Sequence, residues 1–122
     1  MNLCIAVDFD GVICESAWPE IGAVKPRIVR ALLDAQDAGI DLVLYTCRTA
    51  QALADAREIC ALLGLRFAAV NENLPWRIAS YGGDCRKISA DLYIEDRAAG
   101  YSDDAAVLAI EALIERRKGE DR

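Results

Sequence analysis

Short apolar runs alternate with longer segments of helical periodicity along this chain. The short runs have the length of strands and are apolar and partly β-branched, which predicts fully buried strands. The four predicted strands cover residues 2–8, 41–46, 66–70 and 91–94.

Between these runs, apolar residues recur every three to four positions, which predicts amphipathic helices. The first helix is expected to begin at Pro26, a favourable residue in a first turn, and to end near Ala38, just before Gly39. Two further helices are expected at residues 50–63 and 103–117. Residues 71–90 are expected to be irregular, and residues 118–122 to form a frayed tail.

Alternating strands and helices favour right-handed crossovers and a parallel sheet with helices on both faces. The chain has 122 residues, the length of one domain, so we expect a single domain over residues 1–122. The predicted fold is therefore α/β, with three α/β/α layers of the Rossmann-like kind. In such sheets, ligands bind beyond the carboxyl ends of the strands.

Composition narrows the function classes. A formal net charge of −6 argues against a nucleic-acid partner held by a broad basic surface, but it allows phosphorylated small molecules because a bound metal inverts the local charge. The five Cys lack C-x-x-C spacing and there is no His, so we expect reduced thiols rather than a zinc site. With no signal-peptide pattern and no membrane-length apolar stretch, a cytoplasmic protein without a membrane partner is expected.

Polar side chains gather at the ends of the predicted strands. They are Asp8, Asp10, Thr46, Glu95 and Asp96, with Gly11 breaking the first strand and Lys87 lying just before the last. Since the carboxyl ends of parallel strands meet at one edge, these side chains are expected to converge. Neighbouring carboxylates repel unless a cation lies between them or one of them attacks a phosphorus atom. The pattern predicts a magnesium-dependent phosphoryl-transfer site.

Each of these residue types has a task in phosphoryl transfer. A carboxylate nucleophile can form an aspartyl-phosphate, and a second carboxylate two residues on can protonate the leaving oxygen and later activate water. Mg²⁺ takes hard oxygen ligands, which Asp8, the backbone carbonyl of Asp10 and an acidic residue of the Glu95-Asp96 pair would supply. A hydroxyl and a lysine can hold the phosphoryl oxygens.

In four segments, in order, the chain resembles the haloacid dehalogenase (HAD) superfamily of phosphohydrolases. The segments are Val7-Asp8-Phe9-Asp10-Gly11, Leu44-Tyr45-Thr46, Arg86-Lys87 and Tyr93-Ile94-Glu95-Asp96. The resemblance implies Asp8 as nucleophile and Asp10 as general acid and base. It implies Thr46 and Lys87 as phosphate clamps that contact the substrate. It also implies a Mg²⁺ site whose acidic end is Glu95 and Asp96.

Within the superfamily, the chain is similar to small phosphatase-like members without a cap domain. The shared segments are Trp18-Pro19, Ile21-Gly22 and Thr46-Cys47-Arg48, together with the ending Ala90 to Arg97. Two positions depart from the superfamily pattern, Val12 where Thr is usual and Glu95 where the first of two adjacent Asp is usual. In this superfamily a carboxylate at the position of Asp10 goes with phosphatases, so dehalogenation is disfavoured.

The expected site is open, because the segments 11–26 and 70–87 are too short for a cap domain. An open site suits a phosphorylated macromolecule that brings its own cover, a small phosphorylated molecule, or a second subunit that closes the site. Arg48 lies beside the predicted site, where a guanidinium suits either a substrate phosphate or a salt bridge to the acidic residues. With Gly11, it completes the predicted substrate-binding set.

Two other function classes compete with a phosphatase. A response-regulator receiver also gathers acids, a Thr and a Lys around magnesium, but its phospho-accepting Asp follows the third strand, where this chain has Val70-Asn71. A protein that binds a phosphoryl ligand without turnover is the other hypothesis, motivated by Glu95. Sustained hydrolysis of para-nitrophenyl phosphate with magnesium, abolished by Asp8→Asn, distinguishes the enzyme from both.

Overall fold

The computed structural model describes residues 2–120 and has a parallel four-stranded sheet in the order β3-β2-β1-β4. The elements, in chain order, are β1 (Cys4–Val7), α1 (Pro26–Asp37), β2 (Asp41–Leu44), α2 (Ala50–Leu62), β3 (Ala69–Val70), α3 (Pro75–Tyr81), β4 (Leu92–Ile94) and α4 (Asp103–Glu120). The predicted α/β fold of the Rossmann-like kind is confirmed.

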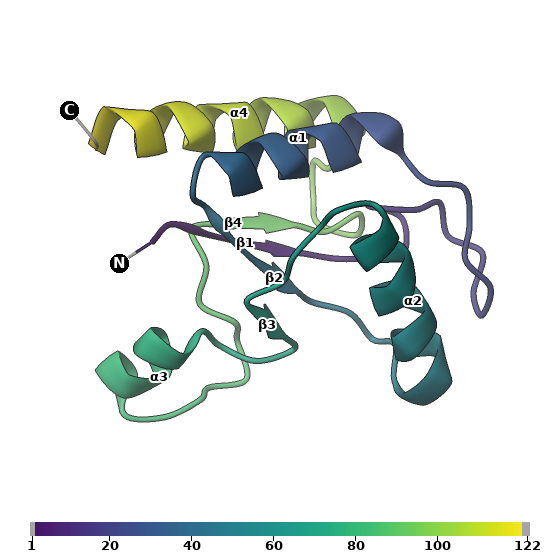
Figure 1. Ribbon diagram of the computed structural model, residues 1–122, viewed down its shortest axis with the longest axis horizontal. Helices are drawn as coiled ribbons and strands as arrows, with labels where there is room; N and C mark the ends of the chain where they lie inside the picture. The colour runs from purple at the N-terminus through teal and green to yellow at the C-terminus, as the bar shows by residue number, and fades with distance from the viewer. Residues whose placement is uncertain (1, 121–122) are drawn as a thin grey trace.

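Alternation along the strands divides the core between the two faces of the sheet. On one face, Ile5, Val7 and Ile94 belong to the larger hydrophobic cluster, which α1 and α4 cover side by side (Figure 1). Buried residues of α2, Ala56 and Cys60, join the same cluster. The other face carries a smaller cluster, formed by Cys4, Ala6, Val43, Ala69, Leu74 and Ile88. This second face is therefore only lightly covered.

The sequence predicts that residues 71–90 are irregular, and this prediction is wrong in part because the segment contains α3. Both ends of α3 carry recognisable signals: Pro75 lies in its first turn, and Gly82 follows it with a left-handed φ of 79°. At the C-terminus, α4 continues to Glu120, so residues 118–120 are helical rather than a frayed tail. Residues 121 and 122 lie outside the described part of the chain.

The two connections where a cap domain would be inserted stay short. The connection between β1 and α1 makes turns and two isolated bridges, Asp10 with Cys14 and Cys14 with Val24. The connection between β3 and β4 contains α3 and extended chain. Within residues 2–120 there is thus no cap domain, as predicted, and no helix there is both long and apolar enough to cross a membrane.

Candidate functional site

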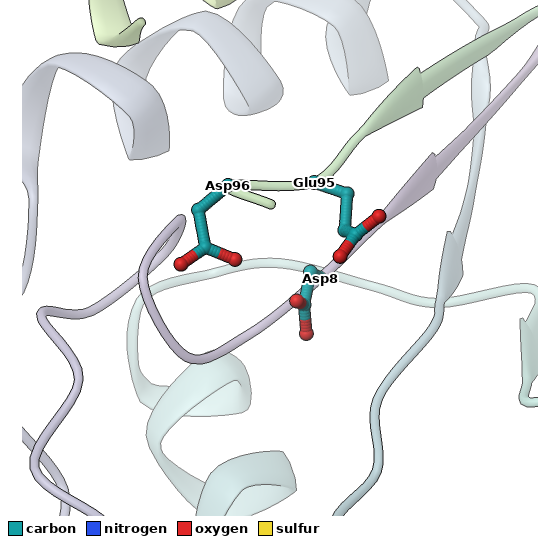
Figure 2. Close-up of side chains that lie close together, drawn as sticks. All are labelled: Asp8, Glu95 and Asp96. Atoms are coloured by element: carbon teal, nitrogen blue, oxygen red, sulfur yellow. The ribbon is translucent and has the colours of Figure 1, made fainter. Parts of the chain in front are cut away.

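Three carboxylates meet at the carboxyl edge of the central strands. Asp8 follows β1 and Glu95 and Asp96 follow β4, and one oxygen of each lies within 4.8 Å of the others (Figure 2). The register explains the meeting, because Val7 pairs with Ile94 and the Asp8 N–H donates to the Ile94 carbonyl at 2.9 Å. The predicted convergence of the first and last strands is confirmed. A donor set made only of carboxylate oxygens fits Mg²⁺.

Repulsion and burial both act on Asp8. The pKa of Asp8 is raised to about 6, chiefly by burial and also by the nearby charges of Asp96 and Glu95, while a hydrogen bond from the Phe9 N–H partly offsets the shift. The three residues line an open hollow of about 210 Å³, which we call the acidic hollow; its lining includes Asp8, Asp10, Thr46, Glu95, Asp96 and Arg97. A bound divalent cation relieves this repulsion, so the site is electrostatically prepared for one.

Arg48 binds the protein itself rather than the acidic hollow. Its Nε and Nη2 donate to the two carboxylate oxygens of Asp10, both at 2.7 Å. The guanidinium also donates to the backbone carbonyls of Pro19 and Glu20 in the flap (residues 15–24), at 3.1 and 2.8 Å, and to the Ala52 carbonyl in α2 at 3.4 Å. The guanidinium is 1% exposed, and hydrogen bonding to Asp10 raises its pKa.

Aromatic rings enclose this ion pair. The guanidinium carbon of Arg48 lies 5.1 Å from the ring centroids of both Phe9 and Trp18. Arg48 therefore ties the flap to Asp10. The predicted contact between Arg48 and substrate does not fit this structure, because its donors are already engaged by the protein. The alternative considered for Arg48, a salt bridge to an acidic site residue, is the arrangement present.

The side chain of Asp10 points to Arg48 and is not part of the carboxylate trio. Its expected contribution to the metal site was through the backbone carbonyl, and within residues 2–120 this oxygen accepts no hydrogen bond. It is thus free for a ligand. A metal contact from the carboxylate of Asp10 requires breaking the pair with Arg48.

The structure places the two predicted phosphate clamps in different hollows. Thr46 lines the acidic hollow; its Oγ1 accepts from the Arg48 N–H at 3.1 Å, and its own N–H donates to Asn71 at 2.8 Å. Lys87 lines a neighbouring hollow with Glu95, and its ammonium lies 5.7 Å from the ring centroid of Tyr93. Because Glu95 lines both hollows, Lys87 lies beside one member of the carboxylate trio.

No protein-family model matches this chain, and no curated protein matches it. A solved structure of a conserved protein from Bacteroides thetaiotaomicron superposes with a TM-score of 0.80 and 36% sequence identity, covering 95% of this chain and 93% of that one. The chain belongs to the same family as that Bacteroides protein. The description of that relative names no activity, so the function rests on the chemistry of this chain's site.

Gly11 shapes the site through its backbone rather than by holding substrate. Its N–H donates to Cys14 at 2.7 Å and its carbonyl accepts from the ammonium of Lys25 at 2.8 Å, so neither group is free for the predicted substrate contact. Its φ of 81° is left-handed, and a Cβ at this position would overlap the carboxylate of Asp96. Glycine is needed here so that Asp96 can approach the turn.

Replacing Gly11 by Ala is therefore expected to displace the Asp96 carboxylate and weaken divalent-cation binding by about 10-fold or more, with about 1 kcal/mol of added backbone strain. Isothermal titration with Mg²⁺ measures the first effect and urea unfolding the second. Gly83→Ala is the matched control, since a Cβ there meets nothing within 4 Å. Unchanged Mg²⁺ affinity in Gly11→Ala contradicts the role assigned to Gly11.

Sequence reasoning missed two residues that support the site. Asn71 adopts a left-handed φ of 54°, and its side chain accepts the Thr46 N–H. An Asn directly after a strand is a signal for this conformation. Lys25 contacts both the Gly11 carbonyl and Asp103 at the start of α4, at 2.8 and 3.2 Å. No pattern in the sequence links positions 11, 25 and 103.

Proposed function

We infer that this protein is a Mg²⁺-dependent phosphohydrolase of the HAD superfamily, acting on a phosphomonoester through an aspartyl-phosphate. The observation that carries the proposal is the carboxylate trio of Asp8, Glu95 and Asp96, which joins the ends of β1 and β4 around a space suited to one cation. Such a trio is costly to fold without a counter-charge, because the acids repel one another. The order of the four matching segments supports the same reaction class.

In the proposed reaction, an Oδ atom of Asp8 attacks the phosphorus, and the bond from phosphorus to the leaving oxygen breaks. Water then attacks phosphorus and releases phosphate, while the Asp8 carboxylate is restored. Asp10 donates a proton to the leaving oxygen and removes one from the attacking water. Thr46 and Lys87 orient the phosphoryl oxygens. The trio and the Asp10 carbonyl would hold Mg²⁺, which would supply positive charge to offset the negative charge on the phosphoryl oxygens.

Asp10 and Arg48 fit this scheme in a specific way. The bidentate pair holds the Asp10 carboxylate within the acidic hollow's wall at a fixed orientation. Both carboxylate oxygens accept hydrogen bonds from Arg48, so removing a proton from water in the second step requires one of these bonds to weaken. Donation to the leaving group in the first step requires a proton on Asp10 and a weaker pairing with Arg48.

A receiver-like function has less support. Asn71, at the end of β3, bonds the Thr46 N–H instead of presenting a phospho-accepting carboxylate. One observation supports binding without turnover: the trio contains Glu95, whose side chain is longer than that of the Asp usual at this position.

We also propose a cytoplasmic protein acting on a phosphorylated small molecule or macromolecule, with a second copy able to cover the open hollow. Its five cysteines are free thiols, as expected in a reducing compartment.

Mg²⁺ is expected to support sustained para-nitrophenyl phosphate hydrolysis and to stabilise the protein. At a Mg²⁺ concentration 100-fold above its Kd, binding to the folded state alone adds about 2.7 kcal/mol. Glu95→Gln and Asp96→Asn should each lose most of the activity and of the thermal shift. The control is Glu58→Gln, an exposed acid of α2. Binding without sustained release of para-nitrophenol supports the non-catalytic alternative, and no Mg²⁺ response in the wild type contradicts the metal site.

A further inference from the structure

Beside the acidic hollow lies a second hollow that the proposed reaction steps leave largely unexplained, which we call the tyrosine slot. It measures about 200 Å³, and its lining includes Ala6, Tyr45, Lys87, Tyr93 and Glu95. Glu95 lines both hollows, so the slot adjoins the carboxylate trio. The slot lies on the lightly covered face of the sheet.

Strand register builds the slot. Ala6 of β1 pairs with Tyr93 of β4 on one side and with Val43 of β2 on the other, and Tyr45 lies two residues beyond Val43. The small Ala6 side chain thus has one tyrosine beside it and a second one diagonal to it, and both tyrosines line the hollow. The two rings remain 46% and 44% exposed, for Tyr45 and Tyr93, although Ala6 beneath them is 2% exposed. Large apolar surfaces next to a buried floor are typical of a binding site.

The ring of Tyr93 is fixed in place before any ligand arrives. Its hydroxyl donates to the Ile88 carbonyl at 2.6 Å and accepts from the Ala90 N–H at 3.2 Å. The Lys87 ammonium, 5.7 Å from the ring centroid, adds positive charge at this wall. The backbone N–H of Tyr45 donates to the Val7 carbonyl at 2.8 Å, whereas its hydroxyl makes no hydrogen bond within residues 2–120, so the ring is available for stacking. The slot therefore offers two aromatic surfaces and one cation.

We propose that the tyrosine slot binds the leaving group of the substrate and that this group is a single aromatic ring. A dry cavity of about 150 Å³ holds one benzene ring, whereas drug-sized ligands need about 300 Å³ or more. The slot's volume of about 200 Å³ thus suits one ring. Ala6 and Asp8 are two residues apart, about 7 Å along the strand, a span that an aryl or arylmethyl phosphate can bridge. This inference rests on the proposed phosphohydrolase function.

The test compares three esters of similar leaving-group reactivity: benzyl, cyclohexylmethyl and propyl phosphate. For the wild type with Mg²⁺, kcat/KM is expected to be highest for the benzyl ester, by about 10-fold, as stacking of one ring provides. Tyr45→Leu should remove most of the ratio between benzyl and propyl esters, and Tyr45→Phe should retain it. Leu108→Ala, which shortens an exposed side chain of α4 that does not line the slot, should leave the ratio unchanged.

Two outcomes overturn the proposal, and they can be told apart because only one of them also overturns the phosphohydrolase function. Hydrolysis of all three esters with equal kcat/KM, or an equal ratio in Tyr45→Leu and wild type, leaves the phosphohydrolase intact and removes the ring site. Absence of Mg²⁺-dependent hydrolysis of every ester removes the proposed function, and the ring site with it. The side chain of Tyr45 is half exposed and its hydroxyl has no hydrogen-bond partner among the described residues, so substituting this side chain is compatible with folding.

Discussion

Replacing Asp8 by Asn is expected to lower kcat for phosphomonoester hydrolysis by about 10⁴-fold or more, because the amide cannot attack phosphorus. The substitution keeps the size and shape of the side chain, so the loss reports chemistry and not packing. Initial rates with para-nitrophenyl phosphate and saturating Mg²⁺ measure it. Asp37→Asn, at an exposed position near the end of α1, is the matched control and should keep wild-type rates.

The same variant is expected to be more stable than the wild type when no divalent cation is present. Burial raises the pKa of Asp8 to about 6 in the folded protein from an ordinary value of 3.8, so folding is favoured while Asp8 holds its proton. That contribution is complete below the ordinary pKa and is lost as pH rises through about 6. Asn does not ionise, so the variant does not lose stability as the pH rises. The free energy of unfolding of Asp8→Asn should therefore exceed that of the wild type by about 1–3 kcal/mol at pH 7.

Urea unfolding at pH 4 and pH 7, with a chelator present, measures this gain. The two proteins should be close in stability at pH 4 and should diverge as the pH rises. Adding Mg²⁺ should then reduce the difference in free energy of unfolding between the two proteins, because it stabilises the wild type. Retained activity in Asp8→Asn, or a variant less stable than wild type at pH 7, contradicts the assignment of Asp8 as a buried, charged nucleophile.

Replacing Arg48 by Ala is expected to destabilise the fold by about 3–5 kcal/mol, since it leaves the partner charge of a buried ion pair unpaired. The change leaves the Asp10 carboxylate without its partner, removes the guanidinium that contacts the rings of Phe9 and Trp18, and removes the hydrogen bonds to the carbonyls of the flap. Arg48→Lys should recover only part of the loss, because an ammonium cannot bind a carboxylate in the bidentate manner. Chemical unfolding at pH 7 measures both variants.

A double-mutant cycle isolates the pair itself. Arg48→Ala combined with Asp10→Ala removes both charges, so the double variant should be less destabilised than the sum of the two single variants, by about 1–3 kcal/mol. Strict additivity would mean that Arg48 acts through the flap and the aromatic rings alone. A stability for Arg48→Ala within about 0.5 kcal/mol of wild type would contradict the role given to it.

The fold and the carboxylate trio followed from the sequence for the same reason. Apolar runs located the strand ends, and parallel strands bring those ends to one edge of the sheet. The structure adds that β1 and β4 are neighbours, which brings Asp8 and Glu95 together. The partner of Asp10 could not be fixed in this way. Arg48 reaches it across 38 positions and also holds the flap, and the path of the flap follows no periodic pattern.

Lys87 and α3 illustrate two other limits. The position of Lys87 just before β4 predicts a side chain near the trio, and Lys87 does line a hollow with Glu95, but its ammonium also lies 5.7 Å from the ring centroid of Tyr93. That second contact depends on side-chain packing that spacing along the chain does not encode. The short helix α3 was missed because seven residues give too few turns for a periodic signal, although Pro75 and Gly82 mark its ends.

The most direct test of the central claim is to trap the covalent intermediate on Asp8. Borohydride reduces an acyl phosphate, so an aspartyl-phosphate quenched during turnover becomes homoserine, which peptide mass spectrometry locates. We expect homoserine at position 8 with substrate and Mg²⁺, and none when a chelator replaces Mg²⁺. Substrate turnover without modification of Asp8, or with modification at another carboxylate, would contradict the account.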